Sequence, residues 1–220
     1  ESTENSKNGK NKKKDLCIET SKQRNQFKKL VKNLKKINKT PVGIQLSHSG
    51  RKGSSYVPWQ KSNAPLKNKN SWITLSSSDI KKDKGWPNPK MMSNKDIINI
   101  KEKFKNAVKN SQRANFDFLE LHMAHGYLLH QFLSPICNKR NDDYGGSKHK
   151  RFKFALDIAK NTRKLWPKNK ILGARITASD HLKNGIDLNE SIEFCKALEK
   201  IGFDYICVSS GGIITKTDLK

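Results

Sequence analysis

Apolar residues follow the helical and the strand period in alternation along most of the chain. The helical period first appears between Phe27 and Ile37 and predicts a helix that Pro41 brings to an end. Ser93 is the expected N-cap of the second helix, with Asp96 at the capping-box position. Gly202 is the expected left-handed cap of the last one. The second, third and fourth predicted helices cover residues 93–108, 150–166 and 188–202.

Short apolar runs between these helices predict buried strands. The runs are VGIQL (42–46), FDFLELH (116–122), ILGARITAS (171–179) and FDYICVSS (203–210). Strands that are apolar almost throughout and alternate with helices predict a parallel sheet covered by helices. The fold class is therefore α/β, with a doubly wound sheet and a TIM (β/α)8 barrel as the two candidates.

Two observations favour the barrel. No Gly-x-Gly-x-x-Gly run follows a predicted strand, and no Walker loop is present. Polar residues gather instead where the strands end, which is where barrel enzymes build their active sites. These residues are Gln45, His48, His122, His125, Arg175, Asp180, Ser209 and Ser210. Four strands make half a barrel, so we expect the chain to hold the middle of one, about strands 3–6, as a piece of a longer polypeptide.

Two segments show neither period. Residues 1–14 are polar and low in complexity, and we expect them to be disordered or a loop. Residues 48–93 are rich in Ser, Pro, Asn, Gly and Trp. They are much longer than an ordinary connection, which indicates a functional loop. The predicted division is a basic segment at 1–14 and a partial barrel at 15–220.

The strong positive charge suggests a polyanionic partner, but the distribution of the lysines along the chain argues against one. The net charge of +25 and the pI near 10.0 would suit a nucleic-acid or membrane-surface partner. However, the lysines are scattered along helix faces, and aromatic residues do not alternate with them. A solvated basic surface is favoured, and a nucleic-acid-binding module stays open as an alternative.

Hydropathy and cysteine use suggest a cytoplasmic protein that does not enter the membrane. No apolar run reaches the length of a membrane helix, and no signal peptide is present. The four cysteines form no Cys-x-x-Cys pair, and Cys195 and Cys207 are expected to be buried, reduced thiols.

The end of the second predicted strand, with the residues that follow it, places His122, His125 and Tyr127 close together. Residues three apart in a strand point to opposite faces. The two imidazoles can therefore converge only if the chain leaves the strand between them, which Gly126 makes easier. Converging imidazoles can donate to one anionic or carbonyl oxygen. A metal site that includes Glu120 and purely structural histidines are the alternatives, and we predict no metal.

Arg175 and Gln45 are polar residues inside apolar strands. A guanidinium in this setting needs an anion or several acceptors beside it. A salt bridge to Glu120 on the neighbouring strand would be a purely structural explanation. Together, Arg175 and Gln45 suit the edge of a flat heterocycle that carries donors and acceptors.

Four runs resemble the Old Yellow Enzyme family, most closely its xenobiotic-reductase-like branch of FMN-dependent ene-reductases. They are GIQLSHSGRKGS (43–54), FDFLELHMAHGYLLHQFLSPICNKRNDDYGGS (116–147), KRFKFALDIAKNTRKLW (150–166) and ILGARITASD (171–180). The pieces VPWQ, WITLSSSDI and GWPNPKMMS of the long loop are similar to segments of that branch. The resemblance covers about residues 15–215.

This resemblance implies an FMN-dependent NAD(P)H oxidoreductase that reduces the activated C=C bond of enones and enals. It implies that Gln45 and Arg175 bind FMN, at its pyrimidine edge and beside N1 and the C2 carbonyl. It also implies that His122 and His125 bind the substrate carbonyl oxygen while the β-carbon accepts hydride from flavin N5. Tyr127 would then protonate the α-carbon.

Other polar residues of the chain are also given expected roles. Ser210 is expected to bind the cofactor, and His48 is expected to support the scaffold. The run NKRNDDYGGS is expected to be structural. The remaining histidines, His130, His149 and His181, are interpreted as incidental.

The chain also departs from the family. Nothing in it matches the first two strands, and it stops before the segments that bind the FMN phosphate. We therefore expect the isolated chain to be inactive and the full-length protein to be a homo-oligomer. A dienoyl-CoA-reductase-like FMN/iron–sulfur flavoprotein stays open as an alternative of the same barrel family.

Overall fold

The structure is a computed structural model that describes residues 2–57, 59–61, 64–67 and 69–214. Its main sheet has five strands, and their spatial order follows their order in the chain. Every neighbouring pair is parallel. A doubly wound sheet would reverse its strand order at a switch point, so this alternative is excluded and the barrel arrangement is confirmed. The strands are β1 (Thr3–Glu4), β2 (Gly43–Ser47), β5 (Phe118–Met123), β6 (Ile171–Thr177) and β7 (Tyr205–Ser209).

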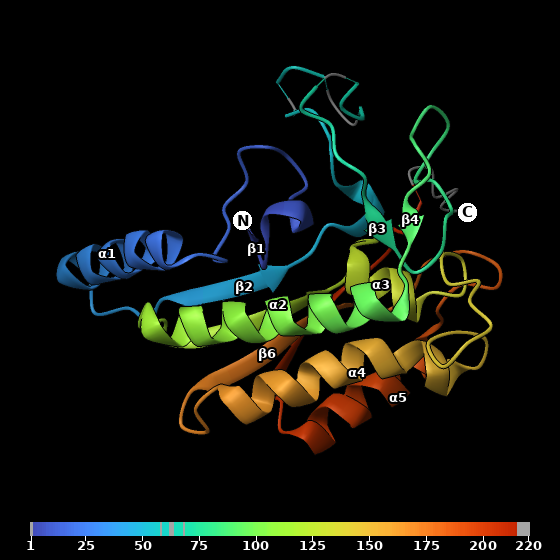
Figure 1. Cartoon of the computed structure of the whole chain (residues 1–220). Coiled ribbons are helices and arrows are strands. Elements are labelled where there is room, and N and C mark those ends of the chain that lie inside the picture. The colour runs from blue at the N-terminus through green and yellow to red at the C-terminus, as the bar shows by residue number, and fades with distance from the viewer. Residues whose placement is uncertain (1, 58, 62–63, 68, 215–220) are drawn as a thin grey trace.

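Three long helices cover one face of the sheet. Figure 1 shows α2, α4 and α5 running side by side along it, with α1 beyond the end of α2. The hydrophobic core lies between these helices and the sheet, where Leu46, Leu121 and Ala174 are fully buried. The helices are α1 (Ser21–Ile37), α2 (Asn94–Arg113), the short α3 (Leu128–Leu133), α4 (Lys148–Leu165) and α5 (Leu188–Ile201).

Capping residues set the helix ends, and two predicted caps are confirmed. Ser93 and Asp96 form the expected capping box of α2, and Gly202 closes α5 with φ +95°. Helix α1 begins at Ser21, six residues before the first apolar residue of its pattern, because Thr20 caps it and forms a second capping box with Gln23. An apolar period cannot reveal a polar first turn.

The prediction that residues 1–14 are disordered or a loop is wrong for residues 3–4 and 7–9. Strand β1 pairs with Leu46 and Ser47 of β2, so the sheet has one strand more than expected. Asn5 is buried, and its backbone N–H donates to the Ser47 carbonyl at 3.0 Å. Residues 7–9 continue as a 3-10 turn. Backbone hydrogen bonds to β2, rather than apolar side chains, hold this segment, which explains why its composition did not reveal it.

The long loop carries small ordered elements beside the C-terminal ends of the strands. It contains a 3-10 turn at Gly50–Lys52 and two short strands, β3 (Leu75–Ser76) and β4 (Lys90–Met91), which pair in parallel. Figure 1 shows β3 and β4 beyond the arrowhead of β2. Side chains of the loop bond to α3, since the Ser77 hydroxyl donates to the Gln131 carbonyl at 2.8 Å.

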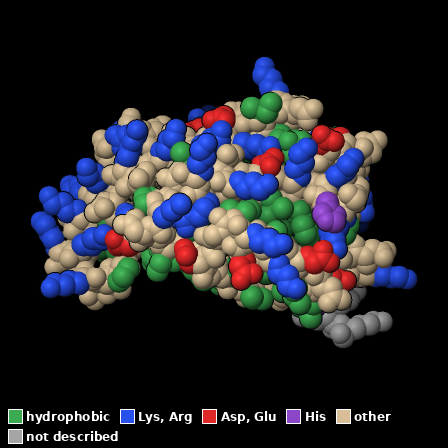
Figure 2. Space-filling model, turned by 90° about the horizontal axis from the view of Figure 1, so that it is seen from below, with side chains coloured by type: hydrophobic (Ala, Val, Ile, Leu, Met, Phe, Trp, Pro, Cys, Tyr) green, Lys and Arg blue, Asp and Glu red, His purple; other side chains and the backbone are tan. Residues whose placement is uncertain are grey.

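The basic side chains are dispersed on the face seen in Figure 2. Lys and Arg side chains lie across the whole of this view, with acidic and hydrophobic side chains between them. Many belong to the outer surfaces of the helices, where i to i+3 pairs such as Glu102 with Lys105 form. This arrangement is typical of a solvated surface.

Further expectations can be compared with the described residues. All four cysteines are unpaired. Cys195 and Cys207 are only half-buried, because they lie on α5 and on the edge strand β7, so their predicted burial is wrong. Within the described ranges, no helix has the length and hydropathy needed to cross a membrane. In the same ranges, no group of three His, Cys, Asp or Glu side chains is arranged to hold a metal ion.

Candidate active site

The register of the parallel strands places the candidate residues in layers on the face opposite the helices. In one layer, Gln45 neighbours Glu120, which neighbours Gly173 and then Tyr205. In another layer, nearer the C-terminal ends of the strands, His122 neighbours Arg175 and then Cys207. Alternate residues of a strand point to opposite faces, so the apolar residues between these layers fill the core beneath the helices.

A left-handed turn brings the two imidazoles together. Strand β5 ends at Met123, and His125 and Gly126 then adopt φ values of +56° and +67°. His125 Nδ1 lies 3.3 Å from His122 Nε2, with the rings nearly perpendicular at 83°. A Cβ on residue 126 would lie 2.2 Å from the Gly212 carbonyl oxygen, so glycine is required there. The prediction that the chain leaves the strand between the imidazoles is confirmed.

Hydrogen bonds fix one imidazole and leave the other adaptable. The Ala124 backbone N–H donates to His122 Nδ1 at 3.2 Å, so His122 carries its proton on Nε2, which faces His125. His125 Nε2 lies 2.6 Å from the Ser209 hydroxyl, which can accept or donate. His125 can therefore carry its proton on either nitrogen, and the pair can offer two N–H donors to a single oxygen.

Both imidazoles are neutral near pH 7. Burial, followed by the neighbouring His125 and Arg175, lowers the pKa of His122 to about 3. Burial, followed by Arg175 and Lys52, lowers the pKa of His125 to about 4. The two rings therefore act as hydrogen-bond donors and not as cations.

These depressed pKa values predict a loss of stability in acid. His48 is also buried, and burial lowers its pKa to about 3. On unfolding below about pH 6.5, each ring gains a proton that it does not bind when folded, so the free energy of unfolding falls as the pH falls toward the folded pKa. By about pH 5, His48 and His122 should each lower the free energy of unfolding by about 2 kcal/mol, since each pH unit below about 6.5 costs roughly 1.4 kcal/mol.

Urea unfolding of the complete protein at about pH 7.5 and about pH 5 measures this effect. Substitution of the exposed His149 by glutamine is the matched control and should leave the pH dependence unchanged. An equal free energy of unfolding at both pH values would contradict the neutral, buried state of His48 and His122.

Tyr127 completes the cluster. It is the N-cap of α3, and its ring centroid lies 4.8 Å from that of His122. Its hydroxyl accepts a hydrogen bond from Asn11 Nδ2 at 3.2 Å. Burial, with a smaller contribution from Glu4, raises the pKa of Tyr127, so the phenol keeps its proton. The contact with Asn11 had no signal in the sequence, because that residue lies in the polar N-terminal segment.

Arg175 has no ion-pair partner among the described residues, and its Nε is buried without a hydrogen bond. The carboxylate of Glu120 is occupied elsewhere: Gln45 Nε2 donates to it at 2.5 Å and the Tyr205 hydroxyl at 3.0 Å. The alternative explanation of Arg175, a salt bridge to Glu120, is therefore not observed. A half-buried guanidinium whose buried Nε donor is unsatisfied suits a ligand that is anionic or rich in acceptors, as the edge of a flavin is.

The structure does not bring Ser210 into this cluster. Ser210 is exposed, whereas Ser209, the last residue of β7, contacts His125. Strand alternation explains the difference, because Ser209 shares a face with Cys207 and Ser210 does not. That alternation could have identified Ser209 from the sequence.

Two structural interpretations are supported, and one is wrong. His48 is buried, and its Nδ1 accepts the Gly50 N–H at 3.1 Å, as a scaffold residue would. Arg140 pairs with Asp142 and donates to two backbone carbonyls, which fits a structural role for its run. His130 was expected to be incidental, but it is fully buried and contacts both Gly126 and Asp180. His149 and His181 are exposed.

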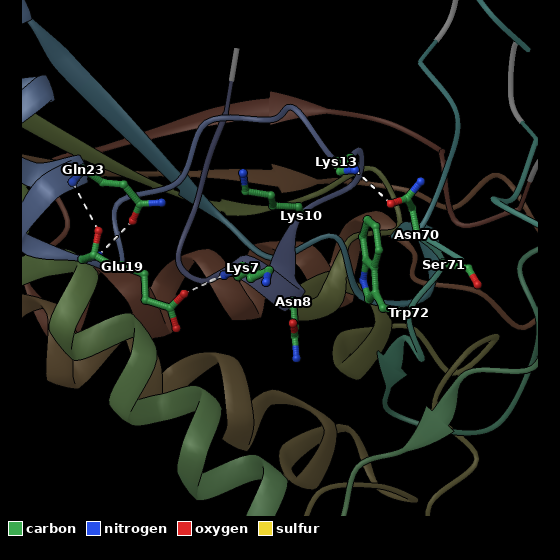
Figure 3. A pocket seen from close by; sticks show the side chains of 10 residues that line it. Lys7, Asn8, Lys10, Lys13, Glu19, Gln23, Asn70, Ser71 and Trp72 are labelled. Atoms are coloured by element: carbon green, nitrogen blue, oxygen red, sulfur yellow. Dashed lines mark hydrogen bonds between the residues drawn. The ribbon is translucent and has the colours of Figure 1, made fainter. Parts of the chain in front are cut away.

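A separate cavity of about 600 Å³ lies between the N-terminal segment, the start of α1 and the long loop. Figure 3 shows that residues of this segment, of the start of α1 and of the long loop line it, among them Lys7, Lys10 and Trp72. Lys13 Nζ reaches across to Asn70 Oδ1 at 2.9 Å. None of the residues of the imidazole cluster lines this cavity, so it is distinct from the candidate active site.

Comparison with known proteins gives a consistent result. The model of the NADH:flavin oxidoreductase / NADH oxidase family matches residues 1–219, which extends the similarity beyond the expected residues 15–215 in both directions. An NADPH dehydrogenase of Clostridium acetobutylicum is 36% identical over 209 residues, which are 94% of this chain and 56% of that protein. The chain spans about half the length of the curated relatives that it matches.

Solved structures show the same fold at lower identity. Morphinone reductase aligns with a TM-score of 0.79 at 21% identity, over 94% of this chain and 57% of that one. A 2-naphthoyl-CoA reductase aligns with a TM-score of 0.82 at 21% identity, over 96% of this chain and 32% of that one. These alignments support a partial (β/α)8 barrel.

Proposed function

The chain belongs to the NADH:flavin oxidoreductase / NADH oxidase family, and from this premise we propose that the complete protein is an FMN-dependent NAD(P)H oxidoreductase. Its substrates would be enones and enals, whose activated C=C bond is reduced. One observation carries the proposal. The neutral imidazoles of His122 and His125, with His122 Nε2 3.3 Å from His125 Nδ1, lie beside the Arg175 guanidinium, which has no ion-pair partner among the described residues. Such a set can polarise a carbonyl oxygen through N–H donors on the two neutral rings.

Arg175 and Gln45 are the residues of this chain that would hold the flavin ring. The Arg175 guanidinium, with its unsatisfied Nε, would meet the acceptors of the pyrimidine edge. The Gln45 amide lies in the next layer and would exchange its bond to Glu120 for one to the ring. FMN, when bound, would supply the hydride for the β-carbon of the substrate.

His122, His125 and Tyr127 would act on the substrate. N–H donors on His122 Nε2 and His125 Nδ1 would bind the carbonyl oxygen, with the Ser209 hydroxyl donating to His125 Nε2 in that state. Tyr127, whose ring lies against His122, would deliver its hydroxyl proton to the α-carbon. Ser210, exposed beyond β7, would contact the cofactor only if the rest of the protein places FMN near it.

The state of the whole protein is also part of the proposal. A barrel must close to pair the outer edges of β1 and β7, so residues 1–220 alone should hold FMN weakly and be inactive. We expect the full-length protein to be a cytoplasmic homo-oligomer.

Substitution of Tyr127 by phenylalanine tests the proposed proton donor. In the complete protein, NADPH should reduce the flavin at an unchanged rate, whereas reoxidation by an enone should slow by about 100-fold, the lower range for loss of a general acid. Stopped-flow absorbance of the flavin measures the two half-reactions separately. Tyr144→Phe is the matched control, because that hydroxyl bonds to Lys101 of α2, away from the cluster. Unchanged reoxidation in Tyr127→Phe would remove Tyr127 from the mechanism.

A further inference from the structure

Side chains from several elements hold every backbone polar group of the His125–Gly126 turn. The His125 N–H donates to Thr177 at 3.0 Å, and the His125 carbonyl accepts from Lys52 Nζ at 2.5 Å. The Gly126 N–H donates to His130 Nδ1 at 2.8 Å, and the Gly126 carbonyl accepts from Gln131 Nε2 at 2.7 Å. The turn is therefore fixed by residues of β6, the long loop and α3.

The turn needs this support because its conformation is unfavourable. His125 has φ +56°, a left-handed conformation that is unfavourable for a non-glycine residue because its Cβ crowds the following carbonyl oxygen. The same turn sets the direction of the His125 ring and the start of α3, where Tyr127 is the N-cap. A small relaxation of the turn would move both side chains away from His122.

His130 connects the turn to a buried carboxylate. Since its Nδ1 accepts from Gly126, His130 carries its proton on Nε2, which lies 3.0 Å from Asp180 Oδ1. The other carboxylate oxygen, Asp180 Oδ2, accepts the Ser134 hydroxyl at 2.7 Å and the Ile186 N–H at 2.9 Å. Both His130 and Asp180 are fully buried.

The charge of Asp180 is retained in this setting. Burial alone would raise its pKa, but the close contact with His130 and the hydrogen bonds from the Ser134 hydroxyl and the Ile186 backbone N–H hold the pKa of Asp180 below its ordinary value. An ionised Asp180 accepts only, so it can bind His130 in one tautomer alone. This is the tautomer that the Gly126 N–H requires.

We propose that Asp180 and His130 are positioning residues that hold the His125–Gly126 turn, and through it His125 and Tyr127, in the geometry that binds the substrate oxygen. The proposal rests on the proposed function, because it assigns these residues to the same oxygen site. Neither residue would touch the substrate. Their effect would pass through the backbone of Gly126.

Three substitutions in the FMN-loaded complete protein separate positioning from stability. His130→Leu removes the acceptor for Gly126, and His130→Asn restores an acceptor near the position of Nδ1. Asp180→Asn keeps the shape but supplies an amide, so in either amide orientation one donor faces another. Ser134→Ala is the matched control, because it removes a different hydrogen bond to Asp180 and leaves the contact of His130 with Gly126 intact.

Phenol affinity, measured by flavin absorbance, is the main readout, with FMN content and the thermal midpoint measured beside it. His130→Leu and Asp180→Asn should weaken phenol binding by at least about 10-fold, since small misplacements of binding groups are costly. His130→Asn should recover most of the affinity, and Ser134→Ala should stay within about twofold. His130→Asn should bind phenol more tightly than His130→Leu even if the two variants have the same thermal midpoint.

Two results would overturn the proposal. One is unchanged phenol affinity in His130→Leu and Asp180→Asn. The other, decisive even if those variants do not fold, is a His130→Asn protein that retains FMN but binds phenol no better than His125→Ala. If His125→Ala itself bound phenol normally, the proposed function would fail, which distinguishes the two failures.

Discussion

Replacement of His122 by alanine in the complete protein is expected to weaken phenol binding by about 100-fold while FMN stays bound. Removal of one preorganised donor from an oxyanion-binding site typically costs a factor of about 100 to 1,000. His122 is the more rigid of the pair, because the Ala124 N–H fixes its tautomer and its Nε2 proton faces the site. Its loss should therefore cost at least as much as the loss of His125.

Phenol titrations monitored by flavin absorbance give the dissociation constants. His149→Ala is the control, since His149 is exposed on α4 and should leave the affinity unchanged. His122→Ala with wild-type phenol affinity would show that the imidazole pair is structural. That outcome would return the site to the structural alternative considered for these histidines.

Substitution of Arg175 by methionine is the second change with a large expected effect. The guanidinium lies between His122 and Cys207 in its layer of the sheet and has no ion-pair partner among the described residues. A hydrogen bond to a charged partner contributes about 1.5–3 kcal/mol, so FMN affinity should fall by roughly 10- to 100-fold. The loss of a fixed cation beside the ring should also lower the reduction potential of the FMN that remains bound.

Fluorescence titration with FMN and a redox titration measure both effects. The FMN affinity and reduction potential of Arg175→Lys should lie between those of the wild type and Arg175→Met, because lysine keeps the charge but lacks the planar fork of the guanidinium. Arg113→Met, at the exposed end of α2, is the control for the loss of a positive charge. If Arg175→Met bound FMN with unchanged affinity and potential, Arg175 would have no role at the cofactor.

The parts of the fold that depend on local signals could be predicted from the sequence. Apolar runs identified β2, β5, β6 and β7, and Ser93 and Gly202 marked helix ends correctly, because caps and periods act over a few residues. The convergence of His122 and His125 also followed from local geometry. Their spacing required a turn, and Gly126 permitted one.

The parts of the fold and of the site that depend on contacts between distant segments could not be predicted from the sequence. Asn11 reaches Tyr127 across 116 positions, and Lys52 reaches His125 across 73. Neither contact leaves a periodic pattern in the sequence. His130 was judged incidental because its partners, the backbone of Gly126 and a carboxylate 50 residues further on, become visible only when the strands are assembled.

The interpretation of the N-terminal segment failed for a related reason. Composition describes what side chains can bury, whereas Thr3 and Glu4 are held through backbone hydrogen bonds to β2. A short edge strand of polar residues has no signature of its own. Its position beside β2 also explains how Asn11, a few residues later, comes to lie at the tyrosine hydroxyl.

The central claim is that Arg175 and the imidazole pair face one flavin ring and one substrate oxygen. A crystal structure of the complete protein with FMN and phenol tests this claim most directly. The account predicts the Arg175 guanidinium at hydrogen-bond distance from the pyrimidine edge of the flavin, and the phenol oxygen between His122 Nε2 and His125 Nδ1. An Arg175 paired with the Glu120 carboxylate, and a phenol bound away from both imidazoles, would contradict it.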